Sequence, residues 1–225
     1  MDFTEAIRIL QQFSCRDLTS TLAAIETSAK GLTSKSCPAV LAACGARDEV
    51  LVAAGMVKKL AGQINVIIHA SGILMCLPKI LEPDEVVQYV SLGAGNTGRA
   101  FDLETNSRIA EFKFIRWRGA DAIRQNSLFK DFYHLAEYST PKRKYMYVLG
   151  TEYPLKFLNG RRAIASVLDK NATLLNRFRG VHGNQYETVR DYYQAHGTEV
   201  ILQDVSLWAN GLAAEGIDEM EPPQA

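Results

Sequence analysis

The chain has 225 residues, 47% of them apolar, and carries 25 basic and 25 acidic side chains. This length and composition predict a soluble globular protein with one domain and an accessory segment, and the zero net charge excludes a uniformly basic chain. The charge is unevenly distributed: residues 99–179 hold sixteen Lys and Arg against eight Asp and Glu, whereas residues 180–225 hold one against eight. A basic middle is what a polyanion-binding surface requires, although charges solvated on opposite sides of the fold would give the same count.

Several features predict a cytoplasmic protein that does not enter a membrane. The N-terminus lacks the basic and apolar succession typical of a secretory signal. The longest apolar stretch, residues 64–81, is interrupted by polar residues, Gly and Pro, which indicates a buried element rather than a membrane span. The four cysteines form no C-x-x-C pair, so we expect reduced thiols. The histidines lack metal-ligand spacing with any Cys, which disfavours zinc.

Residues 1–62 predict a helical N-terminal extension. Asp2 or Thr4 would cap a first helix, and Asp17 would cap a second helix that ends at Gly31. A polar connector and further helix to Gly62 follow. These helices could form a homodimer or contact a partner subunit.

Residues 63–210 predict an α/β domain with a mixed sheet. A helix over 64–81 comes first, with a strand as its alternative because of the β-branched run 66–68. The hydrophobic period then changes to that of strands. We expect strands over 86–92, 99–104, 108–117, 145–150 and 199–205, and helices over 120–138, 161–178 and 187–195. This alternation indicates an α/β layer structure, followed by an acidic, disordered tail over 211–225.

Three glycines, Gly93, Gly95 and Gly98, have the spacing of a dinucleotide-binding loop. Such a loop requires a helix directly after its third glycine, whose N-terminus meets the pyrophosphate. The residues after Gly98 predict a β-hairpin instead. A nicotinamide cofactor is therefore disfavoured, and the glycines are better explained as a loop between antiparallel strands.

The hairpin carries a candidate metal site. Residues two apart on a strand face the same way, so Glu111 and Lys113 share a face while Phe112 points into the core. Asp102 joins that face if the turn leaves an even number of unpaired residues. The two carboxylates and the Phe112 carbonyl suit Mg²⁺, and Lys113 would orient the attacking water or stabilise a phosphoryl transition state. A surface salt bridge is the alternative, and Glu104 is a rival to Asp102 as ligand.

The order of these elements resembles the PD-(D/E)XK nuclease superfamily. The resemblance covers residues 64–150 and lies in a helix, a hairpin with Asp102 on its first strand and Glu111-x-Lys113 on its second, then a helix and a strand. It implies a restriction-endonuclease-like fold, in which the two acids bind Mg²⁺ or Mn²⁺ and the lysine assists the nucleophilic water. It also implies a polar residue on the following helix. Gln125 fits that position, although a place on the helix surface fits equally well.

The resemblance favours DNA over RNA, because most of these relatives act on DNA. Basic side chains near the predicted site would contact the nucleic-acid backbone without reading its sequence. The candidates are Arg99, Arg116, Arg118, Arg124 and Lys130. The sequence therefore predicts a Mg²⁺-dependent endonuclease or exonuclease. The alternative is a catalytically silent relative that uses the fold to bind nucleic acid or a protein partner.

Overall fold

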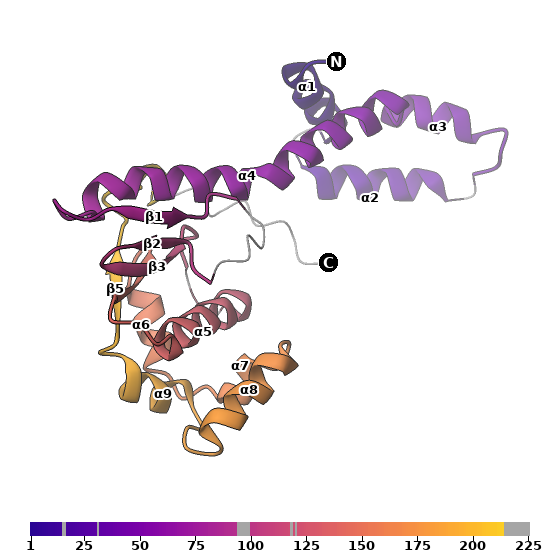
Figure 1. Cartoon of the computed structure of the whole chain (residues 1–225). Helices are drawn as coiled ribbons and strands as arrows, with labels where there is room; N and C mark the ends of the chain where they lie inside the picture. Colours follow the sequence, from indigo (N-terminus) through magenta and orange to yellow (C-terminus); the bar gives the residue numbers. More distant parts are fainter. Residues whose placement is uncertain (15–16, 31, 94–99, 118, 120, 214–225) are drawn as a thin grey trace. The chain divides into compact units, whose positions relative to one another are not determined.

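The computed structural model describes residues 1–14, 17–30, 32–93, 100–117, 119 and 121–213. The chain forms two units that each pack mainly within themselves, Met1–Asn65 and Val66–Ala225. The long helix α4, Asp48–Ile80, contributes its first half to one unit and its second half to the other (Figure 1).

The first unit is helical, as the sequence predicts. It contains α1 (Phe3–Ser14), α2 (Leu18–Ala29), α3 (Cys37–Cys44) and the first half of α4. The predicted caps are present: the Glu5 N–H donates to Asp2 Oδ1 at 2.8 Å, and Asp17 accepts from the N–H groups at the start of α2. The helix expected to continue to Gly62 is instead two helices, because Gly45 adopts a left-handed φ of 69° and ends α3.

The second unit is built on a five-stranded mixed sheet with the order β1-β2-β3-β4-β5. The strands are β1 (Val87–Val90), β2 (Leu103–Thr105), β3 (Arg108–Lys113), β4 (Arg143–Val148) and β5 (Val200–Asp204). The pairs β1–β2 and β2–β3 are antiparallel, whereas β3, β4 and β5 are parallel to one another. The stretch that follows the glycines therefore forms the β2–β3 hairpin that the sequence predicts.

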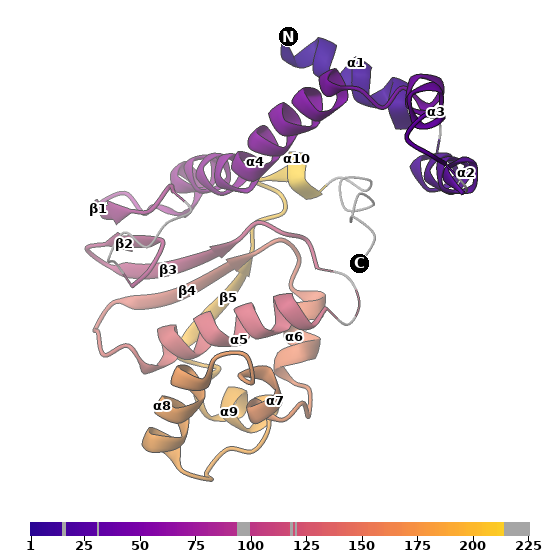
Figure 2. The ribbon, with the colours of Figure 1, turned by 90° about the vertical axis from the view of Figure 1, so that its right-hand side faces the viewer.

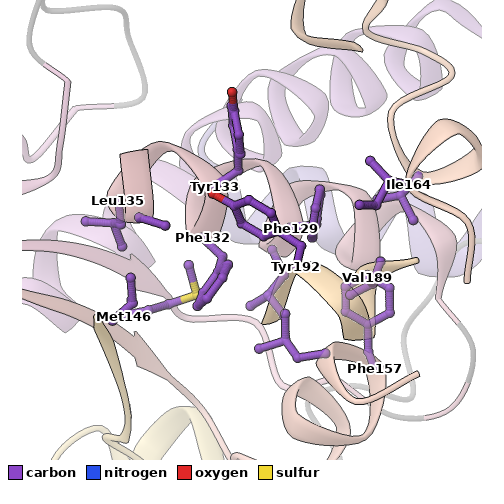
Figure 3. Close-up of a cluster of buried hydrophobic side chains, with 14 of the residues drawn as sticks. Phe129, Phe132, Tyr133, Leu135, Met146, Phe157, Ile164, Val189 and Tyr192 are labelled. Atoms are coloured by element: carbon purple, nitrogen blue, oxygen red, sulfur yellow. The ribbon is translucent and has the colours of Figure 1, made fainter. Parts of the chain in front are cut away.

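Helices cover both faces of this sheet (Figure 2). The second half of α4 packs on the face formed by Ala110 and Phe112 of β3. Helix α5 (Ala122–Glu137) packs on the opposite face, where Ile109 points, together with the helices that connect β4 to β5. Figure 3 shows Phe129, Phe132 and Tyr133 of α5 meeting Tyr192 in this second core. Because side chains alternate between the two faces of a strand, Glu111 and Lys113 lie on the same face as Ile109, the face that α5 covers.

The connection between β4 and β5 differs from the prediction. It contains α6 (Glu152–Leu158), α7 (Ile164–Val167), α8 (Ala172–His182) and α9 (Val189–His196), and α10 (Asn210–Ala213) follows β5. The single helix predicted over 161–178 is wrong, because Asn171 starts a new helix by accepting a hydrogen bond from the Leu174 N–H at 3.0 Å. Helices α6 and α10 were not predicted. Of the predicted disordered tail, residues 214–225 lie outside the described residues.

Two predicted strands are also shorter in the structure. β3 ends at Lys113 rather than at residue 117, and Trp117 packs against Phe157 with ring centroids 5.7 Å apart. The indole N–H of Trp117 donates to the Gly119 carbonyl at 2.8 Å, so a turn replaces the end of the predicted strand. β2 begins at Leu103, four residues later than expected.

Among the described residues, α4 is the one helix long and apolar enough to cross a membrane by length and composition. Only 17% of its apolar window is buried, so the buried element expected over 64–81 is buried along part of its surface. Ile73, Cys76 and Ile80 of α4 are buried against the sheet. The absence of a membrane span stays a prediction.

Gly72 lets α4 lie close to the sheet, because a Cβ atom there would be 2.7 Å from the ring of the buried Phe114. Gly72→Ala is expected to lower the free energy of unfolding by about 1–3 kcal/mol through overpacking. Gly62→Ala is the matched control on the same helix: nothing lies within 4 Å of its added Cβ. It should gain about 0.5–1 kcal/mol from helix propensity. Urea unfolding measures the stability of both variants. An equal rise in the free energy of unfolding in the two would contradict the close packing of Gly72 against Phe114.

Candidate functional site

Asp102, Glu111 and Lys113 come together in the β2–β3 hairpin. Leu103 pairs with Ala110, so the next residues outward, Asp102 and Glu111, lie opposite each other. The two carboxyl groups are close enough for each to shift the pKa of the other. Lys113 lies two residues beyond Glu111 on the same face of β3. The pairing of the hairpin therefore places Asp102 on the same face as Glu111 and Lys113, which the sequence alone left open.

Asp102 is held by two further groups. The Phe112 N–H donates to Asp102 Oδ2 at 3.0 Å, and His69 Nε2, from α4, lies 3.3 Å from Asp102 Oδ1. Burial alone would raise the pKa of Asp102, but the hydrogen bonds from His69 and Phe112 outweigh it and hold the pKa below its ordinary value. Asp102 is thus the ionised member of the carboxyl pair.

Glu111 is the protonated member. Burial raises the pKa of Glu111 to about 9, and the carboxylates of Asp131 and Asp102 act in the same direction, while Lys113 opposes them. The site therefore contains more negative charge than its own side chains neutralise.

Lys113 pairs with an acid from another element. Its Nζ forms an ion pair with Oδ2 of Asp131 on α5. Burial disfavours the charged lysine, but the Asp131 carboxylate outweighs it and holds the pKa of Lys113 above its ordinary value. Lys113 is therefore a permanent cation beside the two carboxyl groups of the hairpin.

The donor set suits a hard divalent ion. Asp102 and Glu111 offer carboxylate oxygens, and the Phe112 carbonyl leaves β3 on the same side as the N–H that bonds Asp102. Mg²⁺ commonly takes one or two carboxylates, with water and substrate oxygens completing its shell. In the described part of the chain, no three His, Cys, Asp or Glu side chains are arranged to hold a metal ion by themselves. A bound ion would thus depend on water or on a ligand for further oxygens.

No protein family, curated protein or solved structure matches this chain. The arrangement of the site has therefore to be interpreted from its own residues.

Two other predicted positions have partners elsewhere. Gln125 Oε1 accepts a hydrogen bond from Arg162, so its amide is directed toward the start of α7. Glu104 Oε1, the rival to Asp102, accepts from Lys142 Nζ at 2.7 Å. Glu104 pairs across the hairpin with Ile109, so Asp102 is the acid that lies opposite Glu111.

The predicted nucleic-acid contacts are spread over the domain. Arg124 pairs with Asp121 at 3.5 Å in the first turn of α5, and Lys130 is exposed on the same helix. Burial opposes ionisation of Asp204, but hydrogen bonds from Ser206 and the nearby charge of Arg116 hold the pKa of Asp204 below its ordinary value. Arg116 thus lies close to the end of β5. Arg99 and Arg118, with Gly95 and Gly98, lie outside the described residues.

Sequence reasoning missed two residues of this site, His69 and Asp131. His69 is one of the polar residues that interrupt the apolar stretch over 64–81, and its position there gives no further signal. Asp131 gives a clearer signal, since it lies between Leu128 and Leu135, three residues after one and four before the other. Both leucines are buried, so the helical period places a carboxylate on the buried face of α5.

The raised pKa of Glu111 predicts how stability changes with pH. The folded state keeps a proton that the unfolded state loses above its ordinary pKa of 4.5, and it releases this proton only near pH 9. Without divalent ions, stability should therefore fall as pH rises between about 5 and about 9. Urea unfolding of wild type and Glu111→Gln over this range isolates the effect. A constant difference in stability between the two proteins would contradict the assignment.

Proposed function

We propose that this chain is a metal-dependent nuclease that hydrolyses phosphodiester bonds in nucleic acid. The observation that carries the proposal is the pair of carboxyl groups, Asp102 and Glu111, which lie opposite each other across the hairpin, with the cation of Lys113 on the same strand face. The protonation of Glu111 supports it, because a divalent ion would relieve the same excess of negative charge that holds the proton.

The order of elements supports the finer assignment to a restriction-endonuclease-like fold. Helix α4, strands β1–β3, helix α5 and strand β4 follow one another as the resemblance to PD-(D/E)XK nucleases requires. Asp102 directly precedes β2, and Glu111 and Lys113 lie on β3. DNA is the proposed substrate on the strength of that resemblance, and the basic stretch over 99–179 would supply backbone contacts.

Each side chain has a distinct role in the proposed reaction. A divalent ion would supply neutralisation of phosphate charge and a lowered pKa of water. Asp102 and Glu111 would hold that ion, and Glu111 would release its proton on binding it. Asp102 is already oriented by His69 and by the Phe112 N–H. The ammonium group of Lys113 would donate hydrogen bonds to the oxygens on which charge develops during attack.

Incubation with a panel of substrates tests the proposal. Single-stranded, double-stranded and branched DNA, and RNA, are incubated with the protein at increasing Mg²⁺ or Mn²⁺, with EDTA as the control. We expect at least one DNA substrate to be cleaved in a metal-dependent manner. Tight binding of these nucleic acids without cleavage in either metal would instead select the catalytically silent alternative.

A further inference from the structure

Asp131 ties helix α5 to the site. Its carboxylate contacts the Lys113 ammonium group across the space between α5 and β3. Both side chains are largely shielded, with 13% of Asp131 and 28% of Lys113 exposed. Burial at this level makes the contact persistent, because water screens such a pair far less than it screens a surface ion pair.

An unpaired carboxylate at position 131 would destabilise the fold. The neighbours that flank it along the buried face of α5, Leu128 and Leu135, are 3% and 0% exposed. A carboxylate among apolar groups is unfavourable unless it is paired, and a buried ion pair is often no more stable than apolar residues of similar volume. Packing alone would therefore be served equally well by an apolar residue at position 131.

What the ion pair does achieve is to fix a flexible group. A lysine side chain has four rotatable bonds and is disordered unless its ammonium group is anchored. The acid on β3 itself, Glu111, lies opposite Asp102 across the hairpin. Asp131 is thus the acid that holds the Lys113 ammonium group in place beside the carboxyl pair.

We propose that Asp131 is a positioning residue, which acts through Lys113 by fixing its ammonium group beside the Asp102–Glu111 pair. The inference rests on the proposed nuclease function. Displacement of a catalytic group by about 1 Å can reduce a rate by about 10²-fold. Asp131→Asn, which keeps the size of the side chain, should therefore lower kcat by about 10- to 100-fold. The KM for DNA and the half-saturating concentration of Mg²⁺ should stay within about 2-fold, because Asp131 contacts neither in this account.

The Lys113→Ala background separates positioning from an independent role. Once Lys113 is Ala, adding Asp131→Asn should change kcat no further, because the group that Asp131 positions is gone. If the double variant loses kcat by the product of the two single losses, Asp131 acts independently of Lys113 and the proposal is wrong. A large change in the Mg²⁺ requirement of Asp131→Asn would also overturn it. Asp131→Glu retains the charge and should recover part of the loss, and it replaces Asp131→Asn if that variant does not fold. Asp169→Asn, on an exposed loop, is the control expected to match wild type.

A second readout does not need activity and so separates this proposal from the proposed function. Acetic anhydride at limiting concentration, followed by mass spectrometry, measures how fast Lys113 is acylated in folded protein without metal or nucleic acid. Acylation of Lys113 should rise several-fold in Asp131→Asn and stay unchanged in Asp169→Asn. Unchanged acylation in Asp131→Asn would show that Asp131 does not hold the lysine, whatever the outcome of the cleavage assays.

Discussion

Lys113→Ala is expected to reduce the rate of metal-dependent DNA cleavage by about 10²–10³-fold, the usual effect of removing one donor to developing transition-state charge. The ammonium group of Lys113 is the cation that the structure places next to the Asp102–Glu111 pair. Single-turnover cleavage of a labelled duplex in Mg²⁺ measures this rate directly.

Lys35→Ala is the matched control for this variant, because Lys35 is an exposed lysine between α2 and α3, outside the basic stretch over 99–179. It should cleave at the wild-type rate. Circular dichroism of Lys113→Ala should show an intact fold, since removal of the lysine leaves Asp131 free to accept a proton. Cleavage by Lys113→Ala within about 3-fold of wild type would remove the lysine from the proposed mechanism.

Arg108→Ala is expected to cause the largest loss of stability, about 3–5 kcal/mol, the usual cost of breaking one side of a buried ion pair. Arg108 is 4% exposed at its side chain and pairs with Glu85, which is 1% exposed. Its Nη1 also donates to the Tyr147 hydroxyl at 2.8 Å. Removal of Arg108 would leave a buried carboxylate at Glu85 without its cation. Urea unfolding at pH 7 measures the loss.

The same pair makes a pH-dependent contribution. Burial raises the pKa of Glu85, but hydrogen bonds from Arg108 and Thr105 outweigh it and lower the pKa to about 2. The contribution of the pair is therefore fully present above pH 4.5 and is lost as pH falls toward 2. Arg143→Ala is the control for Arg108→Ala, because Arg143 pairs with Glu82 at a site where both side chains are about half exposed. If Arg108→Ala lowers the free energy of unfolding as little as Arg143→Ala does, the buried-pair account is wrong.

The sequence predicts that Glu111 and Lys113 share a strand face because this pattern is local. The period of two along β3 separates Glu111 and Lys113 from Phe112 whatever lies around the strand. Only the register of the hairpin was open, and the pairing of Leu103 with Ala110 decides it. The helix α5 was equally predictable, since it has a long hydrophobic pattern, whereas β4 begins and ends two residues earlier than expected.

The remaining features depend on contacts between distant segments. His69 lies 33 residues before Asp102, and only the packing of α4 on the sheet brings the two together. Gln125 was expected at the site, but its partner Arg162 comes from the α6–α7 connection. The break between α7 and α8 depends on the Asn171 cap, which a continuous apolar pattern concealed. These contacts and helix ends are determined by tertiary structure rather than by local propensity.

Titration of Mn²⁺ into the purified protein tests most directly whether the Asp102–Glu111 pair holds a divalent ion. Calorimetry at pH 7 in buffers of different ionisation enthalpy gives both the affinity and the number of protons released. We expect one bound ion with release of about one proton, supplied by Glu111, and at least about 10-fold weaker binding in Glu111→Gln. Equal Mn²⁺ affinity in wild type and Glu111→Gln, or no binding by either protein, would contradict the account.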